Sequence, residues 1–256
     1  MHRFGWLFVV TVSLLAGMAV ASDLAKERRW AAQIVDALLD GEALYLNDGR
    51  ADFLAIETES NDGELHKAAI VMHGTGVHPD WPTVVQPLRV RLIEHGWHTL
   101  SIQMPVLGND AAHEDYAAIY DWVPGRINAA VAHLRAKGAQ RIVLLAHSQG
   151  STMSAYYLAE SQPMLDGFIA IGMSQGNANP AMDNLRHLPR IALPMLDLYG
   201  SEDLPEVIAS AADRKARAGA ANRDYEQQRI EGADHFFDGE EDALLDAVNA
   251  WLDQRY

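Results

Sequence analysis

Apolar positions along this chain follow two spacings, and their succession predicts the order of its elements. From Lys67 onward, short apolar runs of strand length alternate with stretches whose apolar positions recur at helical spacing. Such alternation is typical of the α/β class, with a mostly parallel sheet, helical crossovers and helices on both faces. The expected strands are 67–72, 97–104, 142–146, 167–172, 191–199 and 224–230, and the expected helices are 80–94, 124–138, 151–159, 204–218 and 240–252.

The rest of the pattern is less regular. A helix is expected over 22–39, with Ser22 or Asp23 as its N-cap. Residues 42–59 alternate loosely around an Asn-Asp-Gly turn signal and predict two short strands. Residues 105–120 are polar and acidic, and residues 174–190 are rich in turn-forming side chains. We expect both segments to be loops that cap one end of the sheet.

The first residues resemble a secretory signal peptide. Arg3 is the only charged residue before Asp23, the segment 4–20 is almost wholly apolar, and Ala-Val-Ala at 19–21 is a small-x-small cleavage site. We expect cleavage of segment 1–21 after Ala21. This leaves 22–256 as a single domain in the periplasm or outside the cell, with no stable membrane span. The alternative is an uncleaved anchor, although the apolar run is slightly shorter than the ~20 residues of a span.

Charge and composition narrow the classes of partner. The chain has 256 residues and a formal net charge of −15, and so acidic a protein repels nucleic-acid phosphates and anionic lipid surfaces. We therefore expect no nucleic-acid partner. The chain contains no cysteine, which excludes disulfides and a cysteine nucleophile. Its histidines lack the spacing of a metal site and no glycine-rich phosphate loop follows a strand, so neither a metal nor a cofactor is expected.

Candidate chemistry begins at Ser148. The run Ala-His-Ser-Gln-Gly at 146–150 follows an apolar strand and precedes a helical stretch. A serine between small residues at a sharp strand-to-helix turn is typical of a nucleophile elbow, because the turn brings backbone and side chains close together. Gly150 meets this need, and Ala146 occupies a position where glycine is commoner. The alternative is a polar turn that happens to contain serine.

A second strand end offers hydrogen-bond donors. His-Gly-Thr-Gly at 73–76 directly follows the strand expected at 67–72. The backbone N–H groups of Thr75 and Gln149 are the candidate oxyanion hole. The alternative is a glycine-rich turn that only reverses the chain.

Two more strand ends carry an acid and a base. Asp203 follows the strand expected at 191–199 and is the candidate carboxylate that orients the base, with Glu202 in reserve. Asp197 lies inside that strand, away from its end. His235 follows the last expected strand and is the candidate base, since imidazole suits proton transfer near neutral pH. The alternative for Asp203 is an N-cap of the next helix.

The chain order Ser148, Asp203, His235 is the order in which α/β-hydrolases carry their triad. The chain resembles that superfamily and, more narrowly, a family of uncharacterised exported bacterial α/β-hydrolase-like proteins. The resemblance rests on segments 73–82 and 94–101 and on the elbow at 146–150, and it covers the chain from about Leu44 to its end. It implies the α/β-hydrolase fold.

These residues predict an exported serine hydrolase, similar to carboxylesterases and lipases. It would cleave an ester, thioester or amide through an acyl-enzyme on Ser148, and its partner would be a small-molecule acyl substrate. Two alternatives stay open at this point. One is a non-catalytic envelope protein that uses the same fold for binding or as a scaffold, and the other is an acyltransferase with the same triad.

Overall fold

The computed structural model describes residues 21–256. The predicted signal peptide therefore lies outside the described residues, apart from Ala21. Within the described part of the chain, no helix is long and apolar enough to cross a membrane.

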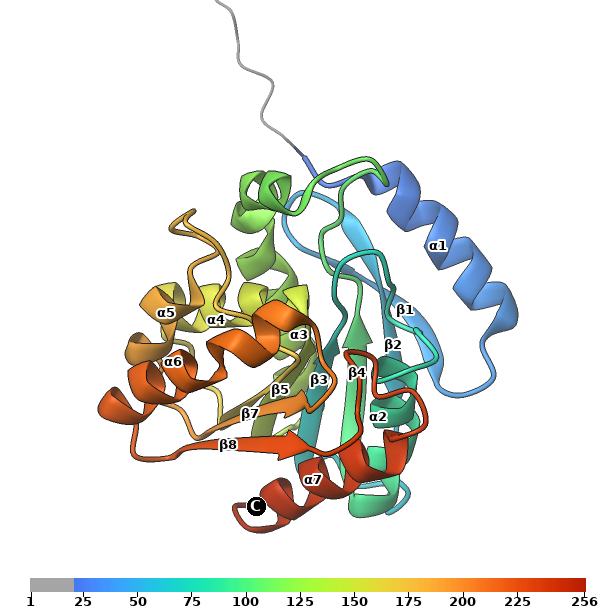
Figure 1. The fold of residues 1–256 in the computed structure, drawn as a ribbon. Helices are drawn as coiled ribbons and strands as arrows, with labels where there is room; N and C mark the ends of the chain where they lie inside the picture. The colour runs from blue at the N-terminus through green and yellow to red at the C-terminus, as the bar shows by residue number, and fades with distance from the viewer. Residues whose placement is uncertain (1–20) are drawn as a thin grey trace, which may run out of the picture.

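An eight-stranded sheet forms the centre of the protein (Figure 1), with the strand order β1-β2-β4-β3-β5-β6-β7-β8. Its strands are β1 Glu42–Asn47, β2 Asp52–Thr58, β3 Lys67–Met72, β4 Trp97–Ile102, β5 Arg141–His147, β6 Gly167–Ile171, β7 Met195–Gly200 and β8 Tyr225–Ile230. All neighbours from β4 to β8 are parallel, whereas β2 is antiparallel to β1 and β4. The carboxyl ends of the parallel strands therefore meet at one edge, where sheets of this kind bind ligands.

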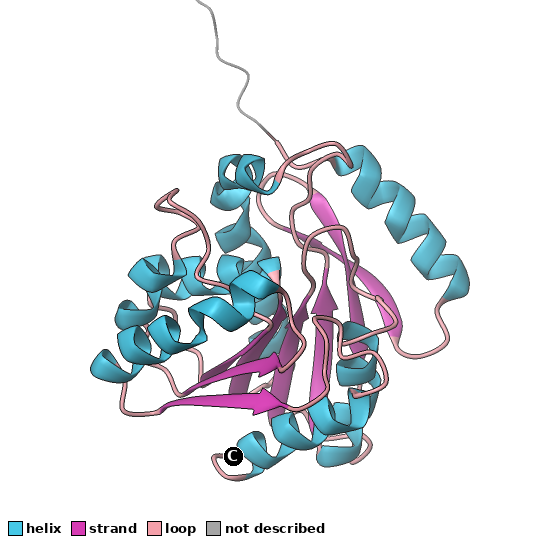
Figure 2. Ribbon diagram, viewed as in Figure 1, coloured by secondary structure: helices cyan, strands magenta, loops and turns pink. Residues whose placement is uncertain are grey.

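Helices cover both faces of the sheet (Figure 2). They are α1 Leu24–Ala37, α2 Val85–Arg91, η1 Leu92–His95, η2 His113–Trp122, α3 Val123–Lys137, α4 Gln149–Ser161, α5 Asn184–His187, η3 Leu188–Arg190, α6 Pro205–Ala221 and α7 Glu241–Asp253. On one face, Ile127 of α3 and Met153 of α4 share a core with Ile70 of β3. On the other face, Leu88 of α2 and Leu244 of α7 share a second core with Val71 of the same strand. Because both faces are buried there, the central strands β3, β5 and β6 are nearly continuous apolar runs. The edge strands β1 and β8 are partly exposed and carry more polar residues.

Most expected elements are confirmed, including the parallel strands, the hairpin within 42–59 and the first helix. Asp23 caps that helix by accepting a hydrogen bond of 2.9 Å from the backbone N–H of Lys26. The segment 105–120 is less irregular than expected, because η2 begins at His113. The segment 174–190 likewise contains the short helices α5 and η3.

Two elements begin four or more residues later than expected. The helix expected over 80–94 begins only at Val85, because Asp80 pairs at 2.6 Å with buried Arg89 instead of capping a helix. Val84 just before it has a φ of 58°, a left-handed conformation that β-branched residues seldom adopt. The strand expected from 191 begins at Met195, because Ile191 closes the turn of η3 through a hydrogen bond to the Leu188 carbonyl.

Candidate active site

Ser148 lies at the sharp turn between β5 and α4. Its backbone φ of 55° and ψ of −122° fall outside the regions that L-residues ordinarily adopt. Two glycines make this turn sterically feasible. A Cβ at Gly74 would come 2.7 Å from the Ser148 Cβ, and a Cβ at Gly150 would come 2.6 Å from the carbonyl oxygen of His73. This is the geometry expected of a nucleophile elbow.

A chain of two hydrogen bonds joins Ser148, His235 and Asp203. His235 Nε2 lies 2.9 Å from Ser148 Oγ, and His235 Nδ1 lies 2.5 Å from Asp203 Oδ1. A carboxylate can only accept, so Nδ1–H donates to Asp203 and Nε2 is left as the acceptor for the serine hydroxyl. The three side chains come from the ends of β5, β7 and β8, which the parallel sheet brings to one edge.

Asp203, rather than its neighbour Glu202, contacts the histidine. The Asp203 side chain is buried, whereas Glu202 is exposed. Burial alone would raise the pKa of Asp203, but the hydrogen bond and charge of His235 and two backbone N–H donors lower the pKa below its ordinary value. Those donors belong to Gly200 and Leu204. Asp203 is therefore held as a carboxylate facing the imidazole.

Asp197 takes no part in this arrangement. It lies within β7 and is fully buried, and the guanidinium of Arg214 donates to its two carboxylate oxygens at 2.8 and 3.2 Å. Tyr225 also donates to it at 2.7 Å. The side chain is satisfied within the fold, as a buried charge must be.

The two candidate oxyanion donors belong to the residue after Ser148 and to the turn after β3. Gln149 is the first residue of α4, so its N–H precedes the first intrahelical acceptor and is free to face a ligand. The Gln149 side chain is held by a separate hydrogen bond, in which Nε2 donates to Tyr120 Oη at 2.7 Å. Thr75 is exposed in the turn after β3. Thr75 and Gln149 both line the cavity that contains Ser148.

His73 braces the turn that carries Thr75, a role that the sequence did not indicate. Its Nδ1 donates to the carbonyl of Gly74 at 2.8 Å, and its Nε2 accepts from the backbone N–H of Met104 at 2.9 Å. Complete burial lowers the pKa of His73 to about 3, so the ring is neutral and holds this tautomer. The only signal available in the sequence is its place as the first residue of the His-Gly-Thr-Gly turn.

A cavity of about 560 Å³ opens over Ser148 and His235. Both segments expected to cap the sheet contribute to it, with His113 and Glu114 from one and Ser174, Gly176 and Asn177 from the other. A second cavity of about 690 Å³ shares Glu114 with the first. Whether the two segments act as a cap stays a prediction.

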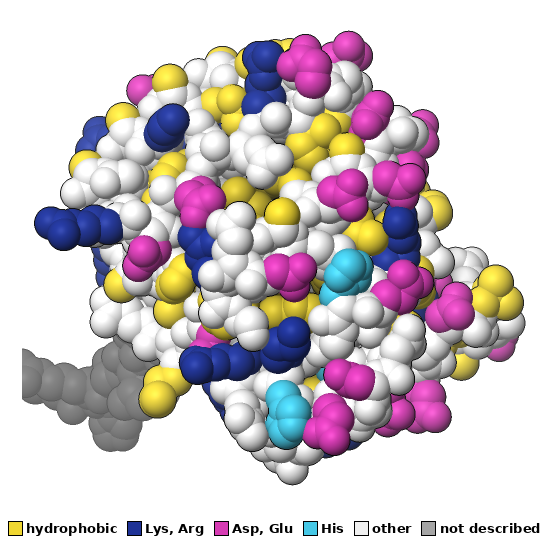
Figure 3. Space-filling model, turned by 90° about the horizontal axis from the view of Figure 1, so that it is seen from below, with side chains coloured by type: hydrophobic (Ala, Val, Ile, Leu, Met, Phe, Trp, Pro, Cys, Tyr) yellow, Lys and Arg dark blue, Asp and Glu magenta, His cyan; other side chains and the backbone are white. Residues whose placement is uncertain are grey.

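The two cavity linings are acidic. Their charged side chains are Asp110, Glu114, Asp115 and Glu206, and within 21–256 neither lining contains a lysine or arginine. Acidic side chains are also spread over the face shown in Figure 3, in keeping with the net charge of −15. Among the described residues, no group of three or more His, Cys, Asp or Glu side chains is arranged to hold a metal ion.

Comparison with known proteins places the chain in a family and gives its fold. A family model described as a protein of unknown function (DUF3530) matches residues 19–121 and 109–254. No curated protein matches the chain.

Three solved structures illustrate the fold relationship. Est1E from Butyrivibrio proteoclasticus is 15% identical over 83% of this chain and 98% of its own, with a TM-score of 0.66. An alpha-beta serine hydrolase homologue from Coxiella burnetii is 17% identical over 83% and 98%, with a TM-score of 0.64. The Pyrococcus furiosus esterase Pf2001 is 14% identical over 86% and 92%, with a TM-score of 0.69. The chain therefore has the α/β-hydrolase fold that its motifs predicted.

Proposed function

Because this chain belongs to DUF3530, a family of unknown function, we propose its activity from its own side chains: it is a serine hydrolase of acyl compounds. The observation that carries the proposal is the continuous hydrogen-bonded chain from Ser148 through His235 to Asp203. It stands beside free backbone donors and a cavity. The fold shared with an esterase and a serine hydrolase homologue supports the same class, although fold alone does not assign chemistry.

The proposed reaction is acyl transfer to water. His235 Nε2 takes the hydroxyl proton as Ser148 Oγ attacks the carbonyl carbon of an ester, thioester or amide. The N–H groups of Thr75 and Gln149 donate to the oxyanion that forms. The C–O, C–S or C–N bond breaks as His235 returns the proton to the leaving group. Water then attacks the acyl-enzyme by the same route, releasing the acid and restoring Ser148.

An acyl-enzyme is the intermediate that tests this proposal. We expect the purified protein to release p-nitrophenol from at least one p-nitrophenyl ester in a series from acetate to octanoate. Mass spectrometry after an acid quench is expected to show a peptide containing Ser148 heavier by the acyl group. No turnover of any ester, together with no acylated peptide, would contradict the proposal.

Export is part of the same proposal. The apolar segment 4–20 and the small-x-small site at 19–21 support processing after Ala21 and a periplasmic or extracellular location. N-terminal sequencing of the protein from the periplasmic fraction or the culture medium is expected to begin at Ser22. A chain that keeps its first residues in the membrane fraction would instead indicate an anchor.

The acidic cavity predicts which acyl substrates are handled poorly. Glu114 and Glu206 line the cavity over Ser148 without a compensating cation from the described residues, so an anionic substrate is repelled as it approaches. We expect a succinate half-ester to have a kcat/KM roughly threefold to tenfold lower than a neutral ester of similar size, since exposed carboxylates act through screened fields.

Two comparisons check this charge preference. The double variant Glu114→Gln, Glu206→Gln is expected to bring the two esters close to parity, and raising the salt concentration should do so partly in the wild type. An unchanged ratio in the double variant would show that these carboxylates do not select the substrate.

A further inference from the structure

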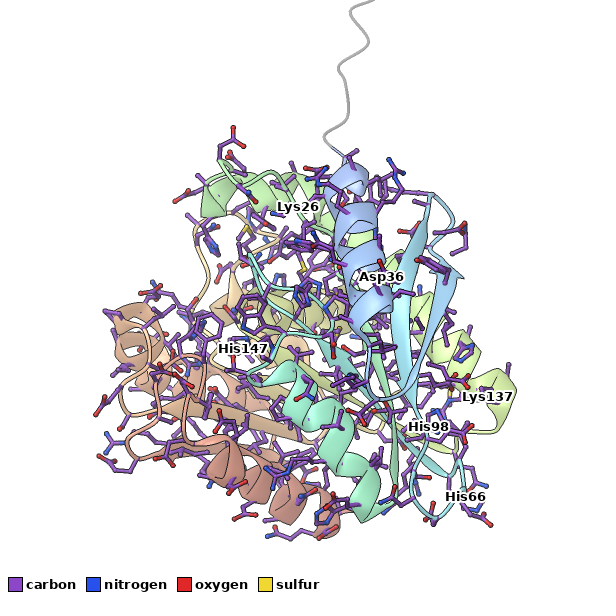
Figure 4. The ribbon with its side chains drawn as sticks, turned by 90° about the vertical axis from the view of Figure 1, so that its right-hand side faces the viewer. Lys26, Asp36, His66, His98, Lys137 and His147 are labelled. Carbon is purple, nitrogen blue, oxygen red and sulfur yellow. The ribbon has the colours of Figure 1, made fainter. Side chains whose placement is uncertain are left out.

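His147, the residue immediately before Ser148, contacts the proposed base on two sides. Its Nε2–H donates to the backbone carbonyl of His235 at 2.8 Å. Its ring lies against the His235 ring with centroids 4.8 Å apart, and against Phe236 at 5.4 Å. The side chain is 2% exposed, and Figure 4 shows it in the interior. None of the proposed catalytic steps uses it.

These contacts tie the nucleophile strand to the loop of the base at two points. Ser148 Oγ holds the imidazole of His235 at its Nε2, and the neighbouring His147 holds the backbone of the same residue. His147 is the last residue of β5, which is a central strand of the sheet and lies between β3 and β6. The loop after β8 can therefore not shift relative to Ser148 without breaking a buried hydrogen bond.

The His147 ring stays neutral while the base works. Because Nε2 is the donor, Nδ1 carries a lone pair, and it is buried with no hydrogen-bond partner. Burial first, and then the charge of His235, lower the pKa of His147 to about 4, against the opposing influence of its hydrogen bond to the His235 carbonyl and of Asp203 and Asp234. A neutral ring adds no repulsion when His235 becomes an imidazolium.

We infer that His147 is a positioning residue that fixes the imidazole of His235 for proton transfer with Ser148. The inference rests on the proposed hydrolase function, because it concerns the base of that reaction. Its physical basis is that proton transfer needs the donor and acceptor atoms held near 3 Å, and that a displacement of about 1 Å can lower a rate by roughly 100-fold.

Two substitutions separate positioning from packing. His147→Phe keeps a ring against His235 but removes the donor, whereas His147→Gln keeps a side-chain N–H at a reach similar to that of Nε2. We expect His147→Phe to lower kcat about 10- to 100-fold with KM nearly unchanged. We expect His147→Gln to stay within about threefold of the wild-type kcat, because the hydrogen bond to the His235 carbonyl is restored.

Thermal unfolding and fluorophosphonate labelling complete the test. Equal losses of kcat in both variants, a loss confined to KM, or a wild-type kcat in His147→Phe would each overturn the positioning role. If His147→Phe does not fold, His147→Leu takes its place as the variant without a donor, with the same expectation.

A wild-type protein that neither labels nor hydrolyses any ester contradicts the proposed function itself. An active wild type with an equally active donor-less variant contradicts only the role of His147.

Discussion

Replacement of Ser148 by alanine is expected to lower kcat for ester hydrolysis by about 10⁵- to 10⁶-fold, because no other group can form the acyl-enzyme. The hydroxyl is 2.9 Å from His235 Nε2 and sits on a strained turn that exposes it to the cavity. Steady-state kinetics with the best p-nitrophenyl ester measures the loss. A residual rate above that in water is expected, since the Thr75 and Gln149 donors remain in place.

Ser161→Ala is the matched control for this variant. Ser161 is the last residue of α4, the helix that Ser148 precedes, and it is exposed. Its removal is expected to leave kcat and KM unchanged. A Ser148→Ala protein that keeps the unfolding midpoint of the wild type and more than about a tenth of its kcat would remove Ser148 from the mechanism.

Asp203→Asn is expected to lower kcat by about 10⁴-fold while leaving the fold intact. The carboxylate accepts the Nδ1–H of His235 at 2.5 Å and so fixes the tautomer with a free Nε2. An asparagine amide can donate to Nδ1 instead, which moves the ring proton to Nε2 and leaves nothing to accept the proton of Ser148.

Glu202→Gln is the control for Asp203→Asn, because the sequence alone leaves Glu202 open as the carboxylate that orients His235. Glu202 precedes Asp203 in the same loop and is exposed, so its amide is expected to keep kcat within about twofold of the wild type, as surface substitutions usually do. A loss in Glu202→Gln as large as that in Asp203→Asn would mean that the loop rearranges and that Glu202 orients the base.

The lowered pKa of Asp203 gives this carboxylate a defined pH dependence. Its pKa lies below the unfolded value of about 3.8, so its ionisation contributes stability that is fully present above that value. The contribution is lost as the pH falls through the lower, folded-state pKa. We therefore expect that protonation of Asp203 does not limit the proposed activity in weakly acidic buffer.

The alternation of apolar runs and helical stretches predicted the parallel sheet and the edge at which the site lies. It did so because strands buried on both faces must be continuously apolar, and parallel strands carry their ends to the same edge. Only the start of the helix expected over 80–94 was wrong: Asp80 and Pro82 have the local signature of a helix start, but α2 begins at Val85. Asp80 instead forms an ion pair with the buried guanidinium of Arg89. That ion pair depends on the tertiary packing that buries Arg89, which the local sequence around Asp80 does not show.

In the candidate site, too, some features are visible in the local sequence and others depend on tertiary packing. The small residues around Ser148 and the order of Ser148, Asp203 and His235 are visible in the sequence because elbow geometry and chain topology constrain them directly. Which of Asp203 and Glu202 contacts His235 depends on the conformation of the loop after β7, which buries Asp203 and leaves Glu202 exposed. The braces His73 and His147 act on backbone groups of distant segments, Met104 and His235, and such contacts leave no local pattern.

Fluorophosphonate labelling of the purified protein tests whether Ser148 is an activated nucleophile, because the probe phosphonylates only a serine activated by a neighbouring base. We expect one adduct per chain, on a peptide that contains Ser148, and no adduct in Ser148→Ala. An unlabelled wild type, or equal labelling of Ser148→Ala, would contradict it.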